Sequence, residues 1–229
     1  MKSPGQFITL EGLDGCGKST QLEMLGEYLR DQGRAVITTR EPGGTKVGQQ
    51  IRELLLNVSP ETITALTELS LMFAARSQHI EQVILPALGR SELVLCDRFT
   101  DSSIAYQGYG RGVPLETIQT LEKLLCQGVR PDLTLILDID AATSIQRAGV
   151  RNRKAHQSNT RFEQEGQQFF ERVREGYLAI ARQEPQRVRI INGSGTIEQL
   201  FVAVCSAVDK FLGISPHGGG NPAGGGRGV

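Results

Sequence analysis

The residues with the clearest chemical potential form a glycine-rich segment near the N-terminus, Gly12-Leu13-Asp14-Gly15-Cys16-Gly17-Lys18-Ser19. They match the pattern Gly-x-x-x-x-Gly-Lys-Ser/Thr, which forms a loop around phosphate groups. A β-prone run at residues 7–10 precedes the segment and an amphipathic helical pattern follows it, which is the context that the motif requires. A glycine-rich turn that matches by chance is the alternative. The segment predicts a site for a nucleoside triphosphate.

The residue types in this loop could bind a nucleotide in different ways. Glycines allow backbone N–H groups to turn toward phosphate oxygens, and the following helix N-terminus adds partial positive charge. Lys18 can reach the β- and γ-phosphates, and the Ser19 hydroxyl can hold Mg²⁺. The residues predicted to bind the nucleotide are Gly12, Leu13, Asp14, Gly15, Cys16, Gly17, Lys18, Ser19 and Thr20.

Asp97 and Arg98 directly follow the apolar run at residues 93–96. An acid at the carboxyl end of a buried strand, near a phosphate loop, is typical of a Mg²⁺ ligand. The planar fork of Arg98 can bridge two phosphate groups. A helix-capping Asp97 beside a surface arginine is the alternative. Asp138 also ends an apolar run and competes as a metal ligand, but it has no neighbouring arginine.

Two further segments indicate a second substrate that carries a phosphate and a base. Arg40 opens the segment 40–45, Arg-Glu-Pro-Gly-Gly-Thr, whose turn leaves backbone amides open, although such turns are also ordinary loops. Phe73 and Arg76 share one face of a helical pattern, where a ring and a guanidinium can stack on a base and bond to it. Phe73 also falls on the apolar stripe, so core packing is an equal alternative.

The segment 102–108, Ser-Ser-Ile-Ala-Tyr-Gln-Gly, places polar groups just after Arg98. The side chains of Ser102, Ser103, Tyr106 and Gln107 can read the edge of a base and a sugar. The start of a capped helix is the structural alternative, and the two interpretations are compatible.

The stretch between Ala141 and Phe162 contains no Asp or Glu but many cations. These are Arg147, Arg151, Arg153, Lys154 and Arg161, together with His156. The stretch is polar and interrupts a helical pattern, so it predicts a mobile lid over about residues 147–162 that closes on phosphates and excludes water. A patch that contacts RNA or DNA is the alternative, but no Phe, Tyr or Trp lies between the basic residues.

The rest of the chain predicts an α/β scaffold for these residues. Five short apolar runs predict parallel strands buried on both faces, and they lie at residues 7–10, 35–39, 93–96, 133–137 and 188–191. Helical patterns separate them, and we expect Pro86 to help end the longest one. Strand–helix alternation gives a five-stranded parallel sheet with helices on both faces, and ligands then bind at the carboxyl ends of the strands.

Composition favours one folded domain without a nucleic acid or membrane partner. The chain has 229 residues and zero formal net charge, and no run approaches the roughly 18 apolar residues of a membrane span. A core-type run within the first ten residues leaves no room for a signal peptide, and four separated cysteines predict free thiols in a cytoplasmic protein. We expect a single domain over residues 1–213 and a disordered glycine-rich tail over residues 214–229.

Together, the ordered motifs resemble the thymidylate kinase family over about residues 6–212. The resemblance rests on the phosphate loop and on segments 40–45, 73–76, 97–99, 102–108 and 161–163. It implies the P-loop nucleoside monophosphate kinase fold and the transfer of a phosphoryl group from ATP to dTMP. The products are dTDP and ADP, in dTTP synthesis for DNA replication. It also implies Mg²⁺ with ATP, a homodimer and a lid.

The resemblance further implies roles on the acceptor side. Phe73 stacks on thymine, and Arg76 bonds to the O4 atom of the base. Ser102 lies near the ring N3 atom. Tyr106 crowds the 2′ position of the sugar and so favours deoxyribose.

It likewise implies which residues handle the phosphates. Asp14 approaches the sugar 3′-hydroxyl, while Arg40 and Arg98 hold the acceptor phosphate. The family places a catalytic arginine either in the phosphate loop or in the lid, and this phosphate loop has none. The implied catalytic set is Lys18, Arg98, Arg151, Arg153 and Asp14.

One position departs from the family pattern. The family often has Asp before the last lid arginine, whereas this chain has Thr160 before Arg161. The contact that holds Arg161 is therefore open.

Two alternatives to this function also stay open at this point. Another nucleoside monophosphate kinase would share the phosphate loop but differ in the base pocket. A non-catalytic nucleotide-binding protein would not need Lys18, Ser19, Asp97 and Arg98 together. A GTPase is disfavoured because the chain has no Asn-Lys-x-Asp motif.

Overall fold

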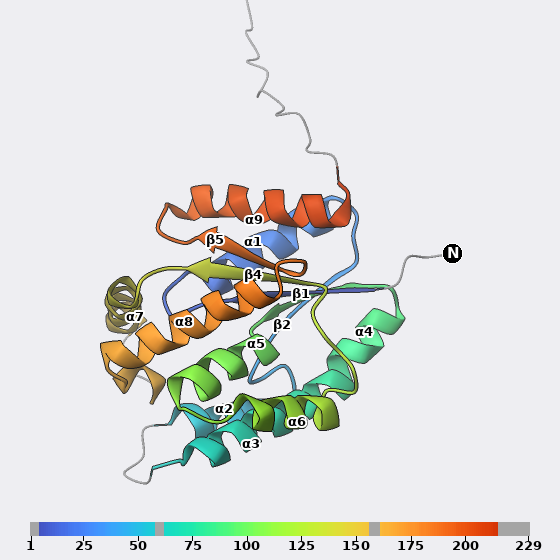
Figure 1. Cartoon of the computed structure of the whole chain (residues 1–229). Helices are drawn as coiled ribbons and strands as arrows, with labels where there is room; N and C mark the ends of the chain where they lie inside the picture. The colour runs from blue at the N-terminus through green and yellow to red at the C-terminus, as the bar shows by residue number, and fades with distance from the viewer. Residues whose placement is uncertain (1–4, 58–61, 156–160, 215–229) are drawn as a thin grey trace, which may run out of the picture.

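Five parallel strands form one sheet in the order β2-β3-β1-β4-β5 (Figure 1). The computed structural model describes residues 5–57, 62–155 and 161–214, except the side chains of residues 153–155. The strands are β1 (Gln6–Glu11), β2 (Val36–Arg40), β3 (Leu93–Asp97), β4 (Leu133–Asp138) and β5 (Val188–Asn192). The predicted α/β fold with a five-stranded parallel sheet is confirmed, and each strand end lies within one residue of its predicted place.

The two outer strands are less buried than predicted. β1, β3 and β4 fill the middle of the sheet and are buried along most of their length. β2 and β5 lie at the edges, where Thr38 is exposed and Ile190 is 49% exposed. The expectation that every strand is buried on both faces is therefore wrong for these two, because an apolar run does not reveal how many neighbours a strand has.

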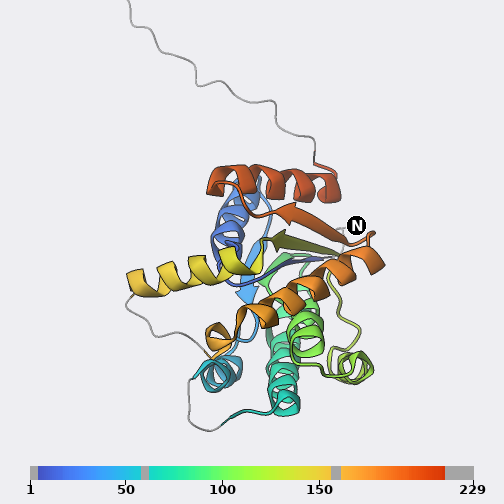
Figure 2. The same ribbon diagram turned by 60° about the vertical axis from the view of Figure 1, so that its left-hand side comes forward.

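Helices cover both faces of the sheet (Figures 1 and 2). The α-helices are α1 (Lys18–Asp31), α2 (Lys46–Leu56), α3 (Ala65–His79), α4 (Leu85–Gly89), α5 (Thr100–Ser103), α6 (Leu115–Leu125), α7 (Ala141–Ala155), α8 (Gln167–Gln183) and α9 (Ile197–Leu212). The π-helical turns η1 (Ile80–Ile84) and η2 (Ile104–Gly110) and the 3₁₀ turn η3 (Phe162–Gln164) lie between them. In the described parts of the chain, no helix is both long and apolar enough to cross a membrane.

The alternation of side chains along β1 decides which helices it contacts. Ile8 and Leu10 share a core cluster with Leu25 of α1. Phe7, which points to the opposite face, shares a second cluster with Phe73 of α3. Thr9 and Glu11 point to the same face of the sheet as Phe7. On that face Glu11 contacts Ser102 of α5 and Tyr177 of α8.

Pro86 does not end the long third helix as predicted. The helix changes to a π turn at Ile80, and Pro86 lies in the first turn of α4, which continues to Gly89. The backbone stays helical through Ile84 and Leu85, so the chain continues from the π turn into α4 with Pro86 near its start, a position that proline tolerates.

The predicted lid is largely helical where the structure describes it. α7 runs through Arg147 and Arg151 to Ala155, so the expectation of a loop from residue 147 is wrong for residues 147–155. Arginine, glutamine and alanine favour helices, and a run of positive charge does not end one. Residues 156–160 of the lid, and residues 215–229 of the predicted tail, lie outside the described residues.

A buried ion pair joins the turn before β5 to α5. Asp101 is 0% exposed and accepts hydrogen bonds from both terminal nitrogens of Arg187, each at 2.7 Å. Thr134 in β4 also donates to Asp101, at 2.9 Å. The carboxylate of Asp101 is thus fully paired without water.

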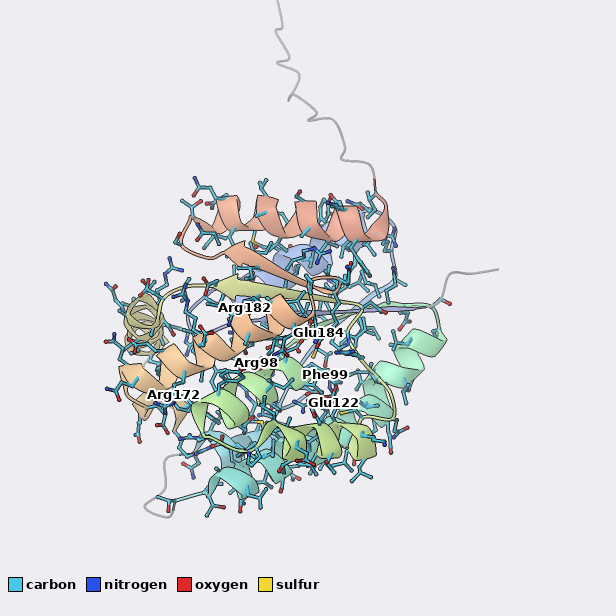
Figure 3. The ribbon with its side chains drawn as sticks, in the orientation of Figure 1. Arg98, Phe99, Glu122, Arg172, Arg182 and Glu184 are labelled. Carbon is cyan, nitrogen blue, oxygen red and sulfur yellow. The ribbon has the colours of Figure 1, made fainter. Side chains whose placement is uncertain are left out.

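Replacing Arg187 with alanine should destabilise the fold strongly. Arg187→Ala leaves the buried Asp101 charge without its cation, which typically costs about 3–5 kcal/mol. Arg182→Ala on α8 (Figure 3) is the control, because the side chains of Arg182 and Glu175 are 62% and 55% exposed, and such pairs contribute about 1 kcal/mol or less. Urea unfolding of both variants measures this, and a loss below about 1 kcal/mol at Arg187 would contradict it.

Candidate active site

A cavity of about 520 Å³ lies at the carboxyl ends of β1, β2 and β3. The strand register explains this, because Leu10, Asp97 and Arg40 lie level with one another across the sheet. The residues that follow each strand therefore meet at one edge. Predicted site residues that line the cavity are Asp14, Gly15, Gly17, Lys18, Ser19, Thr20, Arg40, Arg76, Asp97, Arg98, Ser102, Ser103, Tyr106, Gln107 and Arg151.

The phosphate loop connects β1 to α1 and has the backbone that the motif predicts. Gly12, Gly15 and Gly17 have φ values of 134°, 77° and 99°, a region that side chains disfavour. A Cβ on Gly12 would also lie 2.5 Å from a carbonyl oxygen of β4. Lys18 donates to the carbonyl oxygens of Gly12 and Leu13 at 3.1 and 2.9 Å, which places its ammonium group against the loop.

Three of the predicted loop residues can offer only their backbone to a ligand. Gly12 has no side chain, and Leu13 and Cys16 are 2% and 0% exposed. Their side chains pack in the core that holds the loop in place.

Ser19 and Asp97 form a polar pair at the mouth of the loop. The Ser19 hydroxyl donates to Oδ2 of Asp97 at 3.0 Å, and Oδ1 of Asp97 is buried with no hydrogen-bond partner among the described residues. An unpartnered carboxylate oxygen beside a hydroxyl is a suitable donor set for Mg²⁺. Asp138, the competing candidate, accepts two 2.7 Å hydrogen bonds from Arg174. The structure therefore favours Asp97 over Asp138.

Arg98 lies between the phosphate loop and the polar pocket, near the middle of the molecule (Figure 3). Its Nη1 donates to the Gly12 carbonyl oxygen at 3.0 Å, and its Nη2 donates to Asp14 at 2.8 Å and to the Tyr106 hydroxyl at 3.1 Å. Burial disfavours the Asp14 charge, but the charges of Arg98 and Lys18 outweigh it and hold the pKa of Asp14 below its usual value.

Arg40 and Arg52 also line the cavity, and neither has a carboxylate partner in the described part of the chain. Arg40 is exposed at the end of β2, and Arg52 of α2 donates to the Pro42 carbonyl oxygen at 3.1 Å. Burial, and then the neighbouring charges of Arg40 and Arg98, lower the pKa of Arg52. The sequence analysis missed Arg52, because its helical pattern gave no sign that it faces the strand ends.

Arg76 is held by buried partners. It is 2% exposed, and it donates to Glu41 at 2.7 Å, to the Ser103 hydroxyl at 3.1 Å and to the Phe99 carbonyl oxygen at 3.0 Å. His79 also contacts Glu41, at 2.9 Å. The Arg76 guanidinium thus has a fixed orientation at the wall of the cavity.

Phe73 does not line the cavity. Its ring is 0% exposed and packs in the core with Leu69 and Ile80, so the structure favours core packing over stacking on a base. Met72, one residue earlier on α3, lines the cavity instead. The apolar stripe through Phe73 is confirmed as core, and the sequence analysis missed Met72 because it lies off that stripe.

The last lid arginine has a partner that the sequence did not predict. Arg161 donates to Glu68 at 2.5 Å and to the Leu55 carbonyl oxygen at 3.0 Å. Glu68 is 0% exposed and also accepts from Gln107 at 2.7 Å. The carboxylate of Glu68 thus holds Arg161 and orients Gln107 at the same time.

The described part of the lid brings two arginines to the cavity. Arg147 and Arg151 of α7 line it, and Arg147 donates to the Gly193 carbonyl oxygen at 3.0 Å. Arg151 forms an ion pair with Glu163, and Asn152 donates to the same carboxylate at 2.8 Å. The side chain of Arg153 lies outside the described residues.

Glu11, at the end of β1, is a buried carboxyl that the sequence analysis missed. It accepts hydrogen bonds from the Phe99 amide at 2.7 Å, the Ser102 hydroxyl at 2.6 Å and the Tyr177 hydroxyl at 3.0 Å. Burial, with repulsion from Asp101, raises the pKa of Glu11 to about 7. Glu11 directly follows an apolar strand pattern and belongs to no sequence motif, so nothing in the sequence singled it out.

Comparison with known proteins gives one consistent answer. A family model described as thymidylate kinase matches residues 10–204. The chain belongs to the thymidylate kinase family. The thymidylate kinase of Ectopseudomonas mendocina is 53% identical over 91% of this chain and 97% of that protein, and that of Pelotomaculum thermopropionicum is 48% identical over 91% and 94%.

A solved structure supports the same family assignment. The crystal structure of thymidylate kinase from Ehrlichia chaffeensis covers 90% of this chain and 99% of its own, with 34% identity and a TM-score of 0.70. The predicted thymidylate kinase family, the P-loop nucleoside monophosphate kinase fold and the enzyme class, a kinase that phosphorylates dTMP with ATP, are confirmed.

Proposed function

We propose that this chain transfers the γ-phosphoryl group of ATP to the phosphate of dTMP, giving dTDP and ADP, in the cavity described above. The observation that carries the proposal is the position of Arg98. Its guanidinium lies between the phosphate loop, which suits a nucleoside triphosphate, and a polar pocket that suits a nucleoside monophosphate. One arginine in that place can contact both phosphates.

The donor side is formed by the phosphate loop. Lys18 now donates to loop carbonyls, and its flexible side chain can turn to the β- and γ-phosphates of ATP. Mg²⁺ fits Ser19 and Asp97, because one carboxylate oxygen of Asp97 has no partner in the described residues. When bound there, the ion would offset negative charge on the phosphates.

The acceptor side has a cationic end and a polar end. Arg40, Arg52 and Arg98 can share the phosphate of dTMP, since a dianion offsets the repulsion among three guanidinium groups. Asp14 can accept from the sugar 3′-hydroxyl, and Tyr106 crowds the 2′ position.

The base lies deeper in this arrangement. Met72 packs against thymine with its polarisable thioether, in place of the stacking first predicted for Phe73. Arg76 keeps N–H groups for the O4 atom, and Ser102, Ser103 and Gln107 border the remaining edge.

The mechanism is in-line phosphoryl transfer. The acceptor phosphate is already an anion, so the reaction needs no strong general base. Catalysis then consists of holding the two phosphates in line and offsetting the charge of the transition state. Lys18, Arg98 and the lid arginines Arg151 and Arg153 supply that charge when the lid closes.

The exposed apolar surface and the cysteines bear on assembly and location. Leu54, Leu66 and Leu124 are 54%, 57% and 69% exposed on α2, α3 and α6, which pack side by side. Such an apolar surface suits a homodimer. The free cysteines suit the cytoplasm, where the product would enter dTTP synthesis for DNA replication.

ADP formation from ATP and Mg²⁺ with a panel of acceptors tests the reaction. We expect turnover to favour dTMP strongly over UMP, dCMP, dGMP and AMP, because the pocket reads the thymine edge and excludes a 2′-hydroxyl, whereas dUMP differs from dTMP only in the 5-methyl group. Preference for a different monophosphate would overturn the assignment of the base pocket. ATP binding without turnover on any acceptor would overturn the kinase assignment.

Loss of a lid arginine should slow turnover more than it weakens binding. Of Arg151→Ala and Arg153→Ala, we expect at least one to lower kcat by about 10³-fold or more, the range for such arginines, with the KM for dTMP nearly unchanged. Arg182→Ala is the matched control, because Arg182 is also an exposed arginine paired with a glutamate. Unchanged kcat in both lid variants would contradict the role of the lid.

A further inference from the structure

The carboxylate of Glu11 lies behind the phosphate site rather than in it. The side chain is 0% exposed and forms no ion pair in the described part of the chain. Its partners are the Phe99 amide and the hydroxyls of Ser102 and Tyr177. Each of these three groups reaches Glu11 with a hydrogen, so the carboxylate acts only as an acceptor.

Arg98 forms the next layer. Its Nη1 lies 3.1 Å from the Ser102 hydroxyl oxygen and 3.0 Å from the Tyr177 hydroxyl oxygen, and it donates to both. A hydroxyl has only one hydrogen. The Ser102 and Tyr177 oxygens also lie 2.9 Å apart, where either hydroxyl can donate to the other. The carboxylate of Glu11 is the charged acceptor and attracts both hydrogens, and when they point to it the oxygen lone pairs face Arg98.

The backbone at Arg98 needs similar support. Arg98 has a φ of 73°, a conformation that residues other than glycine rarely adopt. Two hydrogen bonds fix the turn from the side of β1. The Arg98 amide donates to the Leu10 carbonyl oxygen at 3.1 Å, and the Phe99 amide donates to Glu11 at 2.7 Å.

We propose that Glu11 is a positioning residue for phosphoryl transfer, whose carboxylate orients the hydroxyls of Ser102 and Tyr177 and the turn at Phe99 so that the Arg98 guanidinium is held at the phosphates. The proposal rests on the role of Arg98 in the proposed function. Glu11 itself touches neither substrate.

A glutamine variant tests the orientation of the hydroxyls without changing the packing around residue 11. Glu11→Gln keeps the shape of the side chain but replaces one oxygen with an NH₂ group. If that group faces the hydroxyls, it donates to their oxygens and turns their hydrogens toward Arg98. If it faces the Phe99 amide instead, two donors meet. Either way at least one buried hydrogen bond is mismatched.

We expect Glu11→Gln to lower kcat/KM for dTMP by about 10- to 100-fold, the range for one mismatched buried hydrogen bond, with the Kd for ATP within about 3-fold of the parent. A general loss of structure would weaken the binding of ATP as well, because Glu11 immediately precedes the phosphate loop. Asp132→Asn is the matched control. Its carboxylate accepts a hydrogen bond from the Phe7 amide at the other end of β1, at 2.8 Å, so the same chemical change is made to a carboxylate that holds β1. A kcat/KM for dTMP within 2-fold of the parent would overturn the proposal.

A double-mutant cycle tests the route through the hydroxyls. Tyr177→Phe removes one hydroxyl that Glu11 orients, and we expect kcat/KM for dTMP to fall about 3- to 10-fold. The double variant should resemble Glu11→Gln alone, because both changes break one network. If the fold reduction in kcat/KM of the double variant equals the product of the two single reductions, the proposal is overturned. If Glu11→Gln does not fold, unchanged kcat/KM in Tyr177→Phe overturns it.

The pH profile provides a further readout. Glu11 is faced by Arg98, Asp101 and Tyr177, and burial raises its pKa to about 7. Protonation puts a hydrogen on an oxygen that must accept, so kcat/KM of the parent should fall as the pH drops through that value. The Glu11→Gln variant should lack this part of the profile. Profiles of the same shape would contradict the proposal. If the parent shows no dTMP turnover at all, it is the proposed function that fails.

Discussion

The structure of the site depends on how one partly buried guanidinium, that of Arg98, is held. Its donors reach the phosphate loop at Gly12, the carboxylate of Asp14 and the hydroxyls of Ser102, Tyr106 and Tyr177. These contacts join three segments that are far apart in the sequence. A guanidinium with this many partners has little freedom to reorient, which is the condition for offsetting charge without a cost at the moment of reaction.

Two kinds of arginine are found in and around the cavity. Arg76 at its wall and Arg161 near it are paired with the buried carboxylates Glu41 and Glu68, which fix their positions. Arg40 and Arg52 have no such carboxylate in the described residues, although like charges lie nearby. Because unpaired cations repel one another, this end of the cavity is suited to an anion, whereas the paired end is suited to reading a neutral base.

Much of this arrangement could be predicted from the sequence, and the exceptions have physical causes. The phosphate loop and Asp97 were found because glycine spacing and strand ends follow simple rules. Met72 was missed because it lies about 100° around the helix from Phe73, off the apolar stripe, and the base contact was assigned to the aromatic residue. Glu11 and Arg52 were missed because their roles arise from partners on other elements, Tyr177 and Arg98 among them, that only the folded chain brings near.

The most direct test of this account is calorimetric titration of the parent and of Arg98→Lys with dTMP and with thymidine, which lacks the phosphate. Lysine keeps the charge but loses the planar fork. The account predicts that affinity for dTMP falls by about 10- to 100-fold, the value of lost charged hydrogen bonds, while affinity for thymidine stays within about 3-fold. Equal losses for both ligands, or no loss for dTMP, would contradict the placement of the acceptor phosphate at Arg98.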